Sequence, residues 1–196
     1  KPVSVRIFPE PVQAELPIWL TSAGNPETFR QAGELGVGVL THLLGQDLTD
    51  LATKIKEYRS ICAARHRRFG HVVLMLHTFL GPDTEMVRET VRGPFSDYLR
   101  SSLGLWARAG GDLTRGLDPA TMDPKELDFL VGRGFERYFR TGGLFGTVDD
   151  GLAMLQTLAE VGVDEVACLI DFVPDPDLVL AHLPYLAQLR EAWESR

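Results

Sequence analysis

Short apolar runs alternate with amphipathic segments along most of this chain. The apolar runs are bounded by turn-forming residues and are too short for buried helices, so they predict strands. A segment with helical spacing follows each run. Alternating strands and helices are typical of a parallel sheet with right-handed crossovers. The predicted strands cover residues 17–22, 37–44, 71–80 and 163–172.

Two architectures fit four such β/α units: a doubly wound sheet, or about half of a (β/α)₈ barrel. The regular order is interrupted between residues 83 and 143, where the pattern predicts short helices. Gly93 and Pro94 fall within this stretch and predict a kink or a break in its first helix. We therefore expect one α/β unit over residues 1–196, with a helical insertion at about 83–143.

The composition argues against several classes of protein. The net charge is −7 at pH 7, whereas non-specific binding of nucleic acid requires a basic face, so we expect no such partner. No apolar run reaches the ~18 residues of a membrane span, and we expect no membrane association. Cys62 and Cys168 form no CxxC motif, and the histidines have no ligand spacing. These features predict reduced thiols, a cytoplasmic location and no bound metal.

The stretch LTSAGNPETF, residues 20–29, leaves the backbone bare where a helix begins. Asn25 is a good N-cap, and Pro26 suits the first helical position. The first N–H groups of a helix lack intrahelical partners and carry a partial positive charge. Gly24 would let a ligand approach closely, and Ser22 adds a polar group, so the stretch predicts a site for a phosphate or carboxylate. The alternative is a tight turn with a well-capped helix.

This stretch also resembles part of a known family. The sequence PIWLTSAGNPETFRQAGELGVGVL is similar to the fifth strand, loop and helix of the luciferase-like flavin monooxygenases. The sequence FGTVDDGLAMLQTLAEVGVDEVACLIDF resembles the near-terminal segment of that family, with Val148 and Asp149 in place of its usual Pro and Glu. LTHLLGQ, LMLHTF and LRSSLGLW look most like the branch associated with polyketide and nonribosomal-peptide pathways.

The resemblance implies that the loop binds the 5′-phosphate of FMN. Ser22 and Asn25 would contribute side chains, Ala23 and Gly24 would contribute backbone groups, and Thr21 would lie at the end of the strand. The chain would supply strands five to eight of a TIM-type (β/α)₈ barrel, its C-terminal half. It would then be part of a longer polypeptide, or a half-barrel that pairs with another half as a homo-oligomer.

Other candidate site residues lie at predicted strand ends or beside glycines. His42 and His77 are the catalytic candidates, because a histidine there could donate to a flavin carbonyl or act as an acid or base. Asp171, Arg137 and Arg140 are candidate substrate contacts. Each has a structural alternative: a hydrogen-bonded core histidine, a turn-forming aspartate, or surface ion pairs.

On this resemblance we predict a monooxygenase that uses reduced FMN and O₂ to oxygenate an organic substrate. The substrate would be a small or carrier-bound intermediate of a natural-product pathway, and a flavin reductase could supply the reduced FMN. Related barrels use the deazaflavin F420, and the loop does not separate the two cofactors. The alternatives are a non-catalytic half-barrel that serves as a structural or interaction module, and a phosphate-binding α/β enzyme without flavin.

Overall fold

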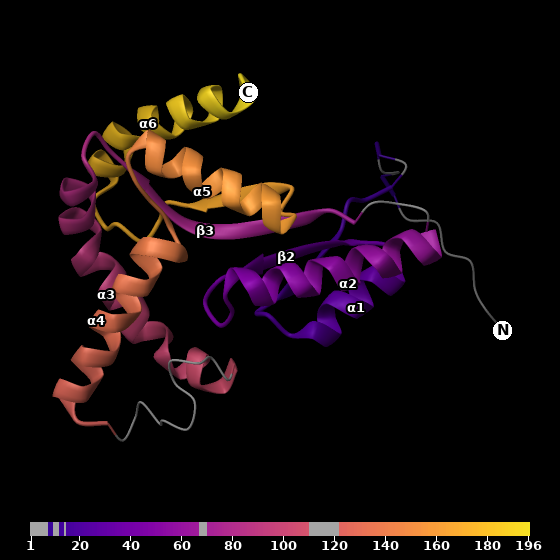
Figure 1. Cartoon of the computed structure of the whole chain (residues 1–196), viewed down its shortest axis with the longest axis horizontal. Coiled ribbons are helices and arrows are strands. Elements are labelled where there is room, and N and C mark those ends of the chain that lie inside the picture. The colour runs from indigo at the N-terminus through magenta and orange to yellow at the C-terminus, as the bar shows by residue number, and fades with distance from the viewer. Residues whose placement is uncertain (1–7, 10–11, 14, 67–69, 110–121) are drawn as a thin grey trace.

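The structure is a computed structural model that describes residues 8–9, 12–13, 15–66, 70–109 and 122–196 (Figure 1). Its strands are β1 (Trp19–Ser22), β2 (Gly38–His42), β3 (Val72–Leu80), β4 (Leu144–Gly146) and β5 (Glu165–Leu169). Its helices are α1 (Pro26–Leu35), α2 (Leu48–His66), α3 (Thr84–Ala109), α4 (Pro124–Thr141), α5 (Val148–Val161) and α6 (Pro176–Glu194).

All of the strands are parallel, and β3 is the centre of the sheet. One edge of β3 pairs with β2, which pairs in turn with β1. The other edge is shared, because β5 pairs with Val73–His77 and the short strand β4 pairs with Thr78–Leu80. The α/β class and the four predicted strands are confirmed, and β4 is a fifth strand that the sequence analysis missed.

Alternation along the strands separates two cores. On one face of the sheet, Val39, Leu74 and Leu76 pack against helices α1, α2, α5 and α6. This is the outer face of a partial (β/α)₈ barrel, which the helices that cross between parallel strands must cover. Figure 1 shows α1 and α2 beside β2, and α5 and α6 beside β3.

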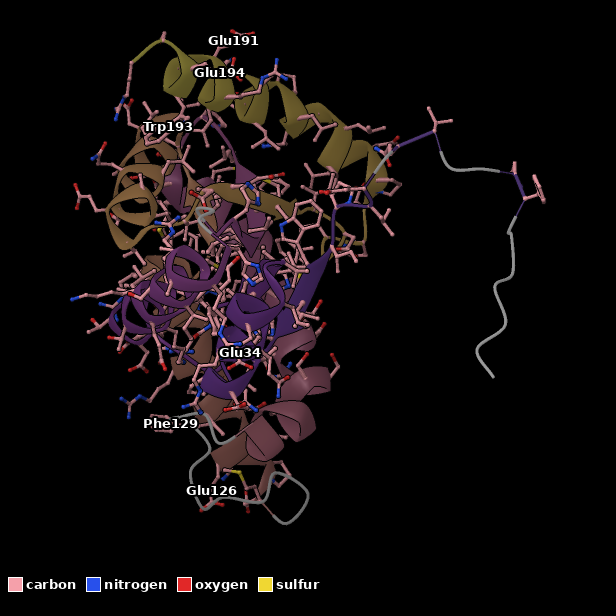
Figure 2. All side chains as sticks on the ribbon, turned by 90° about the vertical axis from the view of Figure 1, so that its right-hand side faces the viewer. Glu34, Glu126, Phe129, Glu191, Trp193 and Glu194 are labelled. Atoms are coloured by element: carbon pink, nitrogen blue, oxygen red, sulfur yellow. The ribbon has the colours of Figure 1, made fainter. Side chains whose placement is uncertain are left out.

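The opposite, inner face carries the second core at the carboxyl ends of the strands. Phe79 of β3 and Phe145 of β4 pack there against Phe95 of α3 and Phe135 of α4. The α3–α4 pair therefore covers this end of the inner face and projects from the end of β3 (Figure 1). Figure 2 shows Phe129 of this pair and Trp193 of α6 toward opposite ends of the view.

Helices α3 and α4 lie within the span expected as a helical insertion, of which residues 110–121 are outside the described part. Of the kink or break expected at Gly93–Pro94, the break is wrong, because α3 continues through Pro94, and the kink stays a prediction. Val87, Val91, Phe95 and Leu99 are all buried on one stripe, and this packing outweighs the hydrogen bond that proline removes. None of the helices in the described residues is long and apolar enough to cross a membrane.

Candidate functional site

The loop after β1 is closed by its own polar groups. Ser22 is buried, its Oγ accepts from the Gly24 N–H at 3.2 Å, and it donates to the Asn25 carbonyl at 3.3 Å. The Asn25 side chain caps α1 by accepting from the Glu27 N–H at 2.9 Å. Gly24 has a positive φ of 95°, and Ala23 and Asn25 are exposed. The expected turn and cap are therefore present, and the bare backbone faces solvent at the start of a helix.

A polar network from β2 and α2 lies behind this loop. The Thr41 hydroxyl donates to the Ser22 carbonyl at 2.8 Å. Gln46 is buried, and its Nε2 donates to Thr41 Oγ1 at 3.0 Å and to the His42 carbonyl at 2.8 Å. Its Oε1 accepts from Lys54 Nζ at 2.8 Å. Sequence reasoning missed Thr41, Gln46 and Lys54, although a polar residue just past a neighbouring strand was a weak signal for Gln46.

The two candidate histidines lie on neighbouring strands at the carboxyl end of the sheet. His42 ends β2, and its Nδ1 accepts from the Leu44 N–H at 3.1 Å, so its proton lies on Nε2. Burial lowers the pKa of His42. Its ring is therefore neutral at neutral pH, with Nε2–H as a donor.

His77 has a more apolar environment. Its ring meets those of Phe95, Tyr98 and Phe172 edge-on, with centroid distances of 4.9, 4.4 and 5.5 Å. Burial lowers the pKa of His77 to about 4, although the nearby Asp171 carboxylate opposes this shift. The structure therefore holds His77 as a neutral ring beneath α3.

The structure brings some of the remaining candidates toward this site. Asp171 is exposed just past β5 and close enough to His77 to affect its pKa. Arg137 of α4 lines a cavity of about 250 Å³ together with Gln46, and within the described residues its Nε has no hydrogen-bond partner. Arg140 is exposed, lies outside the lining of that cavity, and donates from Nε to the Glu136 carbonyl at 3.3 Å.

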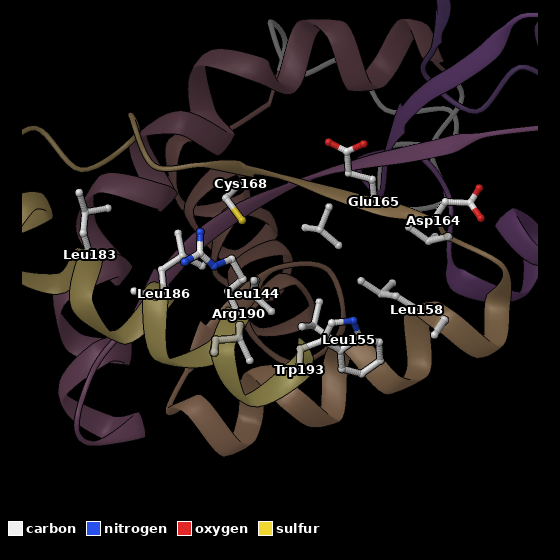
Figure 3. Close-up of a pocket in the computed structure, with 15 residues that line it drawn as sticks. Leu144, Leu155, Leu158, Asp164, Glu165, Cys168, Leu183, Leu186, Arg190 and Trp193 are labelled. Carbon is white, nitrogen blue, oxygen red and sulfur yellow. The ribbon is translucent and has the colours of Figure 1, made fainter. Parts of the chain in front are cut away.

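A larger apolar pocket lies on the outer face, away from the loop and the histidines. It has a volume of about 540 Å³ and is bounded by β5, α5 and α6 (Figure 3). Leu155, Leu186 and Trp193 line it, and Cys168 extends into it from β5. Burial raises the pKa of Cys168, so the thiol stays protonated and is a poor nucleophile. Arg190 is the basic residue of the pocket lining, and the carboxylates of Asp164 and Glu165 line the same pocket (Figure 3).

Parallel strands with covering helices, and polar groups at the carboxyl ends of the strands, define an α/β barrel-type protein with a candidate site at its mouth. The sequence profile of the luciferase-like monooxygenase family matches residues 1–167. This match covers most of the chain, and the chain belongs to that family.

Solved structures agree on the fold. The chain is similar to the monooxygenase RslO1 from Streptomyces bottropensis, with a TM-score of 0.63 and 17% identity over 92% of this chain and 49% of that one. It is also similar to the coenzyme F420-dependent tetrahydromethanopterin reductase from Methanopyrus kandleri, with a TM-score of 0.59 and 16% identity over 89% and 51% of the two chains.

A third similar structure is the oxygenating constituent of 3,6-diketocamphane monooxygenase from Pseudomonas putida in complex with FMN. Its TM-score is 0.56, with 20% identity over 85% of this chain and 46% of that one. The chain thus spans about half the length of these proteins. A search of curated protein sequences found no match.

Proposed function

We propose that this chain provides the phosphate-binding side of a flavin site in a monooxygenase that uses reduced FMN. The observation that carries the proposal is the bare, helix-initiating backbone of Ala23, Gly24 and Asn25 at the carboxyl end of β1. Such a position attracts a phosphate through the helix dipole and through the N–H groups of Ala23 and Asn25, whereas the Gly24 N–H already donates to Ser22 Oγ. The family and the FMN bound to the diketocamphane enzyme support FMN as the ligand.

The residues present fit a phosphate-bearing cofactor. A Cβ at Gly24 would lie 3.3 Å from Gln46 and 3.5 Å from the Lys54 ammonium. Because glycine has no Cβ, the space between the loop backbone, the Gln46 amide and the Lys54 ammonium is not filled by a side chain of residue 24. His42 lies beside the same network, because Gln46 donates to the His42 carbonyl and to Thr41 Oγ1, and Thr41 donates to the Ser22 carbonyl. We expect the rest of the cofactor to extend toward His42.

When bound, the reduced flavin would supply the electrons for the reaction with O₂. In this chain, the loop would anchor the phosphate, and His42 would hold its proton on Nε2 and donate it in a hydrogen bond to the cofactor or the substrate. His77, Phe95 and Phe172 would exclude water from the inner face beneath α3. Asp171 and Arg137 would contact the substrate, which we propose to be an intermediate of a natural-product pathway.

A second candidate is an F420-dependent oxidoreductase, and the similarity to the F420-dependent reductase favours it. FMN and F420 both carry a phosphate group, so a loop that recognises phosphate suits either. In the FMN case, a flavin reductase would be the partner that supplies reduced cofactor. The remainder of the site would come from a longer polypeptide or from another copy of the chain.

A titration followed by NMR tests the proposal on the 196-residue chain. FMN should shift the amide signals of Ala23, Gly24 and Asn25, and Ser22→Ala should weaken binding about fivefold, or ~1 kcal/mol, by removing the group that orders Gly24. Ser101→Ala, at an exposed serine of α3, is the control and should bind FMN like the native chain. Unchanged amide signals would contradict the proposal and would show that the loop serves only as a turn and a helix cap. Tighter binding of F420 than of FMN would favour the second candidate.

A further inference from the structure

We propose that Lys54 is the cation that neutralises the phosphate at the Ala23–Asn25 loop, and that Gln46 positions it there. The inference rests on the proposed function and deepens it. It assigns the discrimination between phosphorylated and unphosphorylated flavins to a residue of α2, outside the loop itself.

The position of the Lys54 ammonium carries the proposal. An ideal Cβ on Gly24 would lie 3.5 Å from Lys54 Nζ, so the ammonium stands beside the bare backbone of the loop. Lys54 lies in the second turn of α2 and reaches the end of a neighbouring strand. A phosphate on the loop amides would lie next to this charge.

Gln46 fixes the direction of the ammonium. Both of its amide hydrogens are used, one by Thr41 Oγ1 and one by the His42 carbonyl, so its oxygen must face Lys54. Thr41 in turn donates to the Ser22 carbonyl, which ties the same network to the loop. Buried polar groups that are fully bonded in this way hold a single geometry.

Lys54 forms no close ion pair within the described part of the chain. No carboxylate lies within 4.0 Å of its ammonium there, and its hydrogen bond goes to the neutral amide of Gln46. Burial lowers the pKa of Lys54, although Asp50 and Asp47 are near enough to oppose that shift. A half-buried cation without a direct counter-ion costs free energy, and a bound anion would offset that cost.

The chemistry of the group defines the ligand class. Lysine presents a compact point charge, which suits a terminal phosphate with more than one negative oxygen. The Lys54 ammonium would have no charged group to pair with in riboflavin, which lacks the phosphate. The ratio of the Kd values for riboflavin and FMN therefore measures the contribution of Lys54 apart from ring binding.

The experiment measures both Kd values by NMR titration on the 196-residue chain. Lys54→Met, which keeps the length of the side chain, should weaken FMN binding about tenfold and leave riboflavin binding unchanged. Lys54→Arg should keep part of the preference. Lys56→Met is the matched control, because Lys56 is exposed on the same helix, and its ratio should equal the native ratio. If Lys54→Met does not fold, Lys54→Gln provides the same comparison.

The outcomes separate the two proposals. If Ser22→Ala weakens FMN binding while Lys54→Met keeps the native ratio, the role of Lys54 is overturned and the loop remains the phosphate site. If the native chain binds FMN no better than riboflavin, or binds neither, the proposed function fails and this inference fails with it. An equal loss of FMN affinity in Lys54→Met and Lys56→Met would show a general charge effect and would also overturn it.

Discussion

Gly24 combines an unusual backbone with a crowded position. Its φ of 95° is strained for any residue with a Cβ, and an added Cβ would lie 3.3 Å from Gln46 Oε1. We expect Gly24→Ala to lower the free energy of unfolding by ~1–2 kcal/mol, measured by urea denaturation. Gly132→Ala, in α4, is the control. Its Cβ would meet nothing within 4 Å, so this change should stabilise the chain by up to ~1 kcal/mol. Equal changes in the free energy of unfolding for Gly24→Ala and Gly132→Ala would contradict the proposal that the backbone at Gly24 requires glycine.

His77 should make the stability depend on pH. Its pKa in the folded chain is about 4, below the ordinary value of 6.5. The unfolded chain therefore takes up the proton first as the pH falls, and the free energy of unfolding should decrease between pH 6.5 and 4. The loss could reach about 3 kcal/mol.

Urea denaturation at several pH values measures this loss. His77→Phe, which keeps an aromatic ring against Phe95, Tyr98 and Phe172, should show a smaller decrease. His66→Gln, at the exposed end of α2, should behave like the native chain. The same slope in His77→Phe and in the native chain would rule out His77 as the source.

For single residues, the sequence predicted those features that depend on neighbours in the chain. The cap by Asn25 and the turn at Gly24 follow from neighbours in the chain, and both are confirmed. Gln46 had only a weak signal and Lys54 had none, because their position beside Gly24 depends on the pairing of β1 with β2 and on the direction of α2. The roles of His42, His77 and Asp171 stay predictions.

Among the elements, β4 shows the limit of periodicity. It has only three residues, Leu144–Gly146, so neither alternation nor an apolar run could reveal it. It is a strand because its backbone pairs with the last residues of β3, which a short pattern cannot encode. The longer elements, such as β3 and α5, carry enough repeats or caps to be predicted.

The α3–α4 pair depends on Phe95. This side chain is fully buried and its ring contacts His77, Tyr138, Phe145 and Phe172. Phe95→Ala should lower the free energy of unfolding by ~3–5 kcal/mol through loss of apolar burial and a residual cavity.

Phe129→Ala is the control on α4, because that ring is 68% exposed, and it should cost well under ~1 kcal/mol. Thermal or urea unfolding of both variants measures the difference. A small effect of Phe95→Ala would mean that the pair is not packed on the sheet in solution.

For the whole molecule, the sheet has two open edges within the described residues, since β1 pairs only with β2 and β5 only with β3. Exposed apolar residues lie beside the first edge, including Ile18 at 50% and Trp19 at 39%. Open edges invite pairing with another strand. We therefore expect the 196-residue chain to associate, with a mass above that of a monomer by light scattering.

A lysine at the edge should weaken this association. Ile18→Lys should lower the measured mass, whereas Phe129→Lys should not. Phe129 is 68% exposed on α4, which packs on α3 and β4 and not beside β1, and its change adds the same charge. A native chain that remains monomeric would show that the edges are protected, and would remove the support for a half-barrel that pairs with another half.

The shared edge of β3 also has a consequence for the order of folding. Val72 donates its N–H to the Asp164 carboxylate across 92 residues, and β5 pairs with β3 over the same gap. Closing so long a loop is slow, because its entropy cost precedes the contacts that offset it. During synthesis, β1, β2 and α2 can assemble early, while the Val73–His77 part of one edge of β3 stays open until β5 leaves the ribosome. The nascent chain is then most exposed to misassembly at its own central strand.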